Sequence, residues 1–339
     1  MLTSKFFPSI FVLFQCFKSF ESHNSQPHPT MAQENAFPKT LEGFGYGFNE
    51  EGQLRQIDPS TGLCTDKPFE FAISSEHERN QKHYEALGEV ITEYVYELLE
   101  KNGLHKIHVP SDVPESEATF VFATKRDLND VKKLLILING SGVVRAGQWA
   151  RRLIMNQSLN HGTQIPYINL ARKNGYDVLV LNTNDNERND EDIPGHASPS
   201  EHAHSVWSQM IADANIEGIA IVAHSFGGHV TMDLAQQHVE AFKNKVFAVG
   251  LTDSVHNSIP PAIRKHMQKI CRNWVTSAQP LNTPSKYQHP LDVQRLSAGH
   301  KEHEWTSWSA MDVLFEFLEE RYKNFVENEK AAKETKVEL

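Results

Sequence analysis

The 339-residue sequence is poor in cysteine, in long apolar runs and in positive charge. Of its three cysteines, Cys16 would leave with a cleaved signal peptide, and Cys64 and Cys271 then form at most one pair, so no disulfide framework is implied. Beyond the first twenty residues no apolar run is long enough for a transmembrane helix, and the chain contains no internal repeat. Membrane-spanning and solenoid architectures are therefore not expected.

The shortage of positive charge limits the kinds of partner. Thirty-three lysines and arginines stand against 43 aspartates and glutamates, a net charge of −10. Gripping a nucleic-acid backbone takes clustered basic residues, and the pairs Lys132-Lys133 and Arg151-Arg152 are too small for that. We therefore expect no direct nucleic-acid binding, and contacts with other proteins if the chain works near RNA. Its 22% charged and 39% hydrophobic residues are typical of a soluble globular domain.

The two ends of the chain carry weak targeting signals. The first twenty residues contain Lys5 and an apolar run from Phe6 to Phe14, which has the length of a signal-peptide core. The last four, Lys336-Val337-Glu338-Leu339, differ by one residue from the K-D-E-L retrieval signal. Together they predict residence in the endoplasmic reticulum lumen. A start at Met31 would instead leave the protein in the nucleus and cytoplasm.

Strand and helix patterns alternate along most of the chain. Residues 44–57 match a β-hairpin, and Ser75 with Glu78 matches a capping box before a helix that ends at Asn102-Gly103. Continuous apolar runs then predict strands covered on both faces; they are residues 119–123, 134–138, 178–181, 219–223 and 246–251. The pattern predicts an α/β fold with a mostly parallel central sheet flanked by helices, in a single domain with an N-terminal β-hairpin.

Two later helices complete the predicted domain organisation. Ser198 and Glu201 form a second capping box, and an amphipathic pattern from Met311 to Phe325 predicts a final helix. The expected organisation is a signal-like segment and linker at 1–40, one domain at 41–325, and a disordered tail at 326–339.

The segment around Ser225 has the pattern of a nucleophile elbow. An apolar, β-branched strand pattern stops at Ala223-His224-Ser225-Phe226-Gly227, which places small residues two positions before and after the serine. In such a strand-turn-helix the serine hydroxyl is exposed above the sheet. We therefore identify Ser225 as a candidate nucleophile.

A serine nucleophile needs a base, an acid that orients the base, and donors for the oxyanion. In α/β hydrolases the chain order is Ser, then Asp or Glu, then His. Asp253 follows the strand pattern at 246–251 and is the preferred acid, with Asp292 as the alternative; His303 is the preferred base, with His300 as the alternative.

The glycine-rich loop after residues 134–138 predicts the remaining parts of the site. The backbone N–H groups of Ser141 and Phe226 are candidate oxyanion donors. The loop lacks a P-loop lysine and a dinucleotide fingerprint, so no cofactor is expected. His202 and His204 are two apart on a helical pattern, whereas helical metal pairs are three or four apart, so no metal site is expected.

Four blocks of sequence resemble the family with sequence similarity 172, which carries the Argonaute-binding-type domain. The blocks are Leu137–Trp149, Ala223–Gly228, Leu251–His256, and Ser297–Gly299 with His303–Trp308. The resemblance implies an α/β-hydrolase-like fold, in which Ser225 matches the family's proposed nucleophile and His303 its histidine position. It also implies Argonaute-type partners and chromatin or splicing proteins.

Two functions follow as hypotheses. The first is a serine hydrolase that acts on an ester, thioester or amide through Ser225, Asp253 and His303, with a small acyl or ester substrate. The second is a non-catalytic scaffold that stabilises protein contacts in Argonaute-linked silencing and alternative splicing at chromatin. The fold alone does not decide between them.

Overall fold

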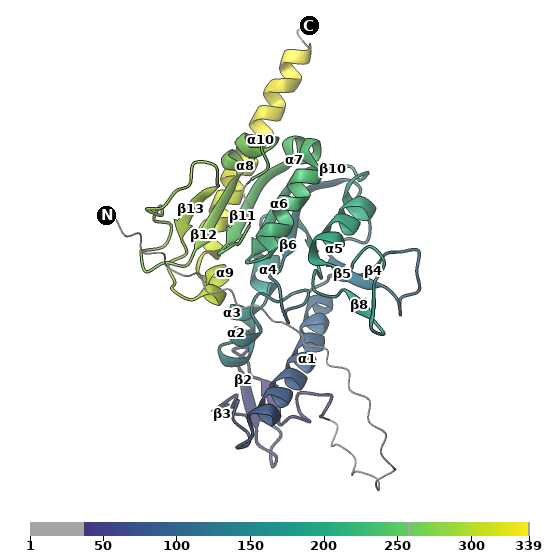
Figure 1. Ribbon diagram of the computed structural model, residues 1–339, viewed down its shortest axis with the longest axis vertical. Coiled ribbons are helices and arrows are strands. Elements are labelled where there is room, and N and C mark those ends of the chain that lie inside the picture. Colours follow the sequence, from purple (N-terminus) through teal and green to yellow (C-terminus); the bar gives the residue numbers. More distant parts are fainter. Residues whose placement is uncertain (1–36, 257–258, 338–339) are drawn as a thin grey trace, which may run out of the picture. The chain divides into compact units, whose positions relative to one another are not determined.

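The computed structural model describes residues 37–256 and 259–337, and the chain from Phe37 to Leu339 forms one compact unit (Figure 1). The signal-like segment, Cys16 and Met31 lie outside the described residues, as do the last two residues of the terminal tetrapeptide.

An eight-stranded sheet forms the centre of this unit, in the order β13-β12-β11-β10-β6-β7-β5-β4. The strands β6, β7, β10, β11, β12 and β13 pair in parallel, whereas β4 and β5 are antiparallel. Their bounds are β4 His105–Val109, β5 Thr119–Ala123, β6 Val131–Ile138, β7 Asp177–Val180, β10 Ile216–His224, β11 Val246–Thr252, β12 Cys271–Val275 and β13 Gln294–Ser297. The predicted mostly parallel α/β sheet is thus confirmed.

Successive residues of the central strands alternate between two apolar cores, one on each face of the sheet. On β10, Ile219, Ile221 and Ala223 join one core, while Ala220 and Val222 join the other. Because both faces are covered by helices, the strands are continuously apolar, as the sequence pattern indicates. The first core includes residues of the helices at 199–206, 227–237, 239–245 and 264–270, and the second includes residues of the helices at 165–173 and 311–337.

The helices that surround the sheet have the following bounds. They are α1 His77–Lys101, α2 Arg151–Asn156, α3 Leu159–Gly162, α4 Ile165–Lys173, α5 Pro199–Val206, the π-helix η1 Trp207–Ile211, α6 Gly227–Gln237, α7 Val239–Lys245, α8 Arg264–Ile270, the 3₁₀ helix η2 His303–Trp305, α9 Thr306–Ser309 and α10 Met311–Val337.

The N-terminal hairpin is present and gains a third strand. Strands β1 (Tyr46–Phe48), β2 (Leu54–Ile57) and β3 (Cys64–Pro68) form an antiparallel sheet, and Leu54 packs in a third apolar core with Leu87 and Ile91 of α1. A second small hairpin pairs β8 (Glu187–Arg188) with β9 (Glu191–Asp192). Cys64 on β3 and Cys271 on β12 are both free thiols.

The N-terminal ends of two helices differ in their agreement with the sequence patterns. Ser198 caps α5 by accepting a hydrogen bond from the Glu201 N–H at 3.2 Å, as expected. The capping box of Ser75 and Glu78 does not form, because α1 begins two residues after Ser75 and has no side-chain cap. The neighbouring Ser74 is held instead by the side chain of Asn80, whose Oδ1 accepts the Ser74 N–H at 2.9 Å.

The C-terminal helix is longer than the sequence predicts. Disorder is expected after residue 325, but α10 continues to Val337. The added segment is composed largely of glutamate, lysine and alanine, which are strong helix formers. No helix in the described part of the chain is long and apolar enough to cross a membrane.

Candidate catalytic site

Ser225 lies in a tight turn between a buried strand and a helix. Strand β10 ends at His224 and α6 begins at Gly227. Ser225 has a φ of 52°, in the left-handed region that non-glycine residues rarely adopt. Its N–H donates to the Thr252 carbonyl, and its own carbonyl accepts from the N–H groups of Gly228 and Val255, each at 3.1 Å. The strained conformation is therefore held by hydrogen bonds from both sides of the turn.

Two glycines after Ser225 allow α6 to approach the neighbouring loops. A Cβ on Gly227 would lie 2.8 Å from the carbonyl oxygens of Ile138 and Asn139, at the end of β6. A Cβ on Gly228 would lie 1.5 Å from the Ser254 hydroxyl oxygen, in the loop after β11. No side chain fits at either position, so the small residues of the motif serve this close packing.

Asp253 and His303 form a hydrogen-bonded pair near this turn. The Nδ1 of His303, the first residue of η2, lies 2.7 Å from Oδ2 of Asp253, which directly follows β11. The Thr276 N–H donates to the other carboxylate oxygen at 3.0 Å. Burial tends to raise the pKa of Asp253, but the hydrogen bonds from His303 and Thr276 outweigh it and lower the pKa. Asp253 is therefore a carboxylate at neutral pH.

The alternative acid and base have other partners. Asp292 pairs with His256 at 2.8 Å and with Arg295 at 2.6 Å. The ring of His300 stacks on Trp305 with centroids 5.0 Å apart, and its Nδ1 accepts the Glu302 N–H at 3.1 Å. Among the described residues, His303 is the histidine that bonds to Asp253.

Ser225 and His303 line one cavity of about 290 Å³. The glycine-rich loop after β6 forms another wall, with Ser141 among its lining residues. Among the described residues, no hydrogen bond joins the Ser225 hydroxyl to His303, and the N–H groups of Ser141 and Phe226 donate to no protein acceptor. Both amides are thus free to donate to a bound group.

His224, the residue before Ser225, contacts the ring of His303. It is fully buried, and its ring centroid lies 4.6 Å from that of His303. Its Nδ1 lies 3.1 Å from Thr252 Oγ1, which in turn lies 2.8 Å from Ser307 Oγ. Burial foremost, and the neighbouring His303, lower the pKa of His224 to about 3, so this ring is neutral. Its place in the motif is the only sequence signal for this contact, and the sequence pattern predicts no role for His224.

A second feature that the sequence does not reveal is an ion-pair clamp around His303. Arg152 of α2 bonds to Glu302 at 2.7 Å and also to Glu304, the two residues that flank His303. Arg152 and Glu304 also line the cavity. The clamp joins the segment that carries His303 to α2, which follows the glycine-rich loop.

The histidines considered as metal ligands form a buried network instead. The Nδ1 atoms of His196 and His202 are 3.0 Å apart, and His202 Nε2 accepts the Asn182 N–H at 3.1 Å. Burial foremost lowers the pKa of His196 to about 4 and that of His202 to about 3. His204 faces His238. Within the described ranges, no group of three or more His, Cys, Asp or Glu side chains could hold a metal ion.

Solved structures with related backbones include a histone deacetylase from Saccharomyces cerevisiae, with a TM-score of 0.48 and 12% identity over 69% of this chain and 97% of that one. An α/β hydrolase from Vibrio vulnificus has a TM-score of 0.32 and 16% identity over 52% of this chain and 53% of that one. Similarity at this level carries no argument about activity. The mostly parallel sheet with a strand-turn-helix at Ser225 is itself α/β-hydrolase-like.

The names of related proteins correct the cellular location expected for this protein. The human cotranscriptional regulator ARB2A is 43% identical over 343 residues, which cover 84% of this chain and 81% of the human protein. A homologue of the same regulator from Xenopus tropicalis is 42% identical, covering 84% and 80%. Transcription takes place in the nucleus, so the expectation of residence in the endoplasmic reticulum lumen is wrong. Short terminal signals of this kind also arise by chance in unrelated sequences.

A domain family matches most of the described chain. The Arb2 domain matches residues 37–189 and 186–281, a span that contains Ser225 and Asp253 and ends before His303. A FAM172 family protein homologue from Caenorhabditis elegans is 38% identical over 287 residues, covering 83% of this chain and 87% of that protein. The chain therefore belongs to the Arb2 domain family, also named FAM172.

Proposed function

We propose that this protein is a nuclear cotranscriptional regulator whose Arb2 domain carries a serine-hydrolase site. The names of the relatives support the first part of the proposal. The second part depends on one observation: the strained Ser225 and His303 line the same cavity, and His303 is bonded to the Asp253 carboxylate at 2.7 Å. An arrangement of this kind is suited to acyl transfer.

The proposed first step is acylation of Ser225. Its Oγ attacks the carbonyl carbon of an ester, thioester or amide, and its proton passes to Nε2 of His303. The Nδ1–H of His303 stays bonded to the Asp253 carboxylate, which fixes the tautomer and stabilises the imidazolium that forms. The protonated histidine then donates its proton to the leaving group as the carbon–heteroatom bond breaks.

Water completes the proposed cycle. His303 takes a proton from the water as its oxygen attacks the acyl carbon, and returns that proton to Ser225 Oγ when the acyl bond breaks. In both steps the negative oxygen of the tetrahedral intermediate would accept hydrogen bonds from the Ser141 and Phe226 N–H groups. Loss of one such donor typically costs about 3 kcal/mol of transition-state stabilisation.

The cavity favours a small acyl group over a long one. Its volume of about 290 Å³ is at the low end for ligand sites. No cofactor is needed for this chemistry, because the nucleophile, the base and the acid all come from the chain. The substrate class we propose is therefore a small acyl ester, thioester or amide.

A non-catalytic role is the second candidate, and two observations favour it. The relatives are named for regulation and not for hydrolysis. In addition, the Ser225 hydroxyl makes no hydrogen bond to His303 in the described structure. In this alternative the domain stabilises contacts with Argonaute-type, chromatin or splicing proteins, without direct nucleic-acid binding.

A fluorophosphonate probe tests the catalytic part of the proposal, because it reacts at a useful rate only with an activated, exposed serine. The purified protein should be labelled, and Ser225→Ala should abolish the labelling. Ser111→Ala, a change at an exposed serine before β5, is the matched control and should be labelled like the unchanged protein. Equal labelling of Ser225→Ala would contradict the proposed nucleophile.

Complementation then separates the two candidates. In cells that lack the protein, Ser225→Ala should fail to restore the pattern of spliced transcripts if hydrolysis carries the role. Full restoration by a Ser225→Ala protein that still binds its partners after ribonuclease treatment would instead establish the scaffold.

A further inference from the structure

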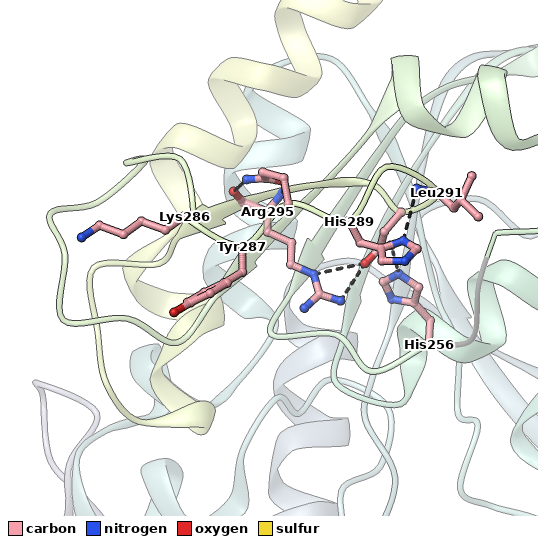
Figure 2. Close-up of a pocket in the computed structure, with 8 residues that line it drawn as sticks. His256, Lys286, Tyr287, His289, Leu291 and Arg295 are labelled. Carbon is pink, nitrogen blue, oxygen red and sulfur yellow. Dashed lines mark hydrogen bonds and ion pairs between the residues drawn. The ribbon is translucent and has the colours of Figure 1, made fainter. Parts of the chain in front are cut away.

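A second cavity, of about 600 Å³, lies on the loop that joins β12 to β13. Lys286, Tyr287 and His289 line it from this loop, Arg295 from β13, and His256 from the loop after β11 (Figure 2). Among the described residues, none lines both this cavity and the cavity of Ser225 and His303. The proposed catalytic chemistry makes no use of it.

The walls of this cavity are fixed by side-chain hydrogen bonds. The Gln288 amide donates to the carbonyls of Ser285 and Arg295 at 3.1 and 2.6 Å, and its oxygen accepts the Arg295 N–H at 3.0 Å. On the other side, Gln268 of α8 donates to the carbonyls of Pro290 and Asp292 at 2.8 and 3.1 Å. A loop held in this way loses little conformational entropy when it binds a ligand.

Among the described lining residues, Asp292 is the carboxylate of this cavity, and its hydrogen-bonding capacity is already used. Oδ1 of Asp292 bonds to His256 Nε2 at 2.8 Å and to the Val293 N–H at 2.7 Å, and Oδ2 accepts two hydrogen bonds from Arg295, at 3.1 and 2.6 Å. These bonds outweigh the effect of burial and hold the pKa of Asp292 low, so it is ionised. Its charge is balanced by that of Arg295.

The groups that remain free are donors of hydrogen bonds. Among the described residues, Nζ of Lys286, Nη1 of Arg295 and Nε2 of His289 form no hydrogen bond or ion pair with the protein. Figure 2 shows Arg295 between Tyr287 and the two histidines, with Lys286 farther out on the same loop. The cavity thus presents one uncompensated positive charge and several N–H donors on a protein whose net charge is −10.

We propose that this cavity, with free donors and a saturated carboxylate, binds an acidic peptide segment of a partner protein. Carboxylates of the peptide would accept hydrogen bonds from Lys286, Arg295 and His289. Tyr287 is 87% exposed and Leu291 is 45% exposed, so both offer apolar contact to neighbouring side chains of the peptide. RNA is disfavoured, because one uncompensated lysine on an acidic protein neutralises few phosphates.

The proposal goes beyond the proposed function and does not depend on it. None of the groups that would contact the peptide belongs to the candidate catalytic site. The inferred docking site applies whether the domain hydrolyses an acyl compound or acts as a scaffold, and Ser225→Ala should bind the peptide like the unchanged protein.

Fluorescence anisotropy of the full chain tests the proposal. The probe is a fluorescein-labelled peptide with two glutamates for each leucine, and its counterpart with lysine for glutamate is the control ligand. Lys286→Glu should weaken binding of the acidic probe about tenfold, since it places a like charge beside the peptide. Tyr287→Ala should also weaken it several-fold, while Lys67→Glu, a change at an exposed lysine of β3, should leave it unchanged.

Salt and competitors complete the test. Binding should weaken several-fold between about 0.05 M and about 0.5 M salt, because exposed charges are screened. Equal affinity of Lys286→Glu and Lys67→Glu, or preference for the basic peptide, would overturn the proposal. Displacement of the acidic probe by single-stranded RNA at lower concentration than by unlabelled acidic peptide would also overturn it and indicate a nucleic-acid site.

Discussion

At the scale of single residues, two strained backbone positions lie at the candidate site. Ser225 and Asp253 have φ values of 52° and 44°, and neither is a glycine. Such conformations cost on the order of 1–3 kcal/mol each and persist only where the surrounding structure holds them. Here Thr252, Gly228 and Trp274 hold them through backbone hydrogen bonds. Ser225 lines the cavity and the Asp253 carboxylate bonds to His303, which also lines it, and this is consistent with a function for both strained residues.

The two histidines of the loop should differ sharply in their effect on reactivity. His303→Ala should cut the rate of fluorophosphonate labelling by about a hundredfold or more, because it removes the proposed base. His300→Ala should change it less than about threefold, since His300 stacks on Trp305 and is not bonded to Asp253. The measurement is the time course of labelling at neutral pH. A larger effect from His300→Ala would show that the base is misassigned.

At the scale of elements, α2 holds the segment that carries His303. Arg152 pairs with Glu302 and Glu304, on either side of the histidine. Exposed ion pairs typically contribute less than about 1 kcal/mol to stability. The clamp would therefore act mainly by positioning His303, because a small displacement of a catalytic group lowers the reaction rate by a large factor.

Loss of the clamp should lower the rate of labelling at Ser225 strongly and the free energy of unfolding only slightly. Arg152→Ala should lower the rate of labelling at Ser225 about tenfold, while the free energy of unfolding falls by less than about 1 kcal/mol. Arg152→Lys should recover part of the rate, because one ion pair can re-form. Arg126→Ala, at an exposed arginine after β5, is the matched control. Equal rates for Arg152→Ala and Arg126→Ala would exclude a positioning role.

At the scale of the whole molecule, three buried neutral histidines link stability to pH. Burial lowers the pKa of His196 to about 4 and those of His202 and His224 to about 3. In the unfolded chain they titrate near the ordinary value of about 6.5. Between these values the unfolded state binds protons that the folded state does not. Their contribution is therefore present above pH 6.5 and is lost as the pH falls below it.

Urea unfolding at several pH values tests this linkage. The free energy of unfolding should fall from pH 6.5 to 4.5, by up to about 1.4 kcal/mol per pH unit for each histidine. The carboxylates Asp253 and Asp292, whose pKa values are lowered, add to the loss only at more acid pH. His202→Gln should reduce the slope, by up to about 1.4 kcal/mol per pH unit, because it removes one of these histidines. A stability that is constant over this range would contradict the buried neutral state.

Most of the fold could be predicted because it follows from local patterns. Continuous apolar runs identified β5, β6, β7, β10 and β11, since strands covered on both faces need no polar residues. Strand β12, Cys-Arg-Asn-Trp-Val, was missed because it contains polar residues. Asn273 is fully buried there and bonds through its side chain to the backbone of Ser254 on the loop after β11, a partner that no local pattern reveals.

Part of the candidate site could likewise be predicted from local sequence, and part of it could not. The sequence by itself determined the turn at Ser225, because a strand followed by a serine between small residues has few other backbone solutions. It also placed Asp253 and His303 in the order expected of such a site. Only the tertiary structure shows that His303 bonds to Asp253, while His300 stacks on Trp305 and Asp292 pairs with His256, and only it brings His224 and Arg152 to the His303 segment. These contacts depend on how η2 lies at the end of β11, because the distance between residues far apart in the chain is set by packing and not by their separation in sequence.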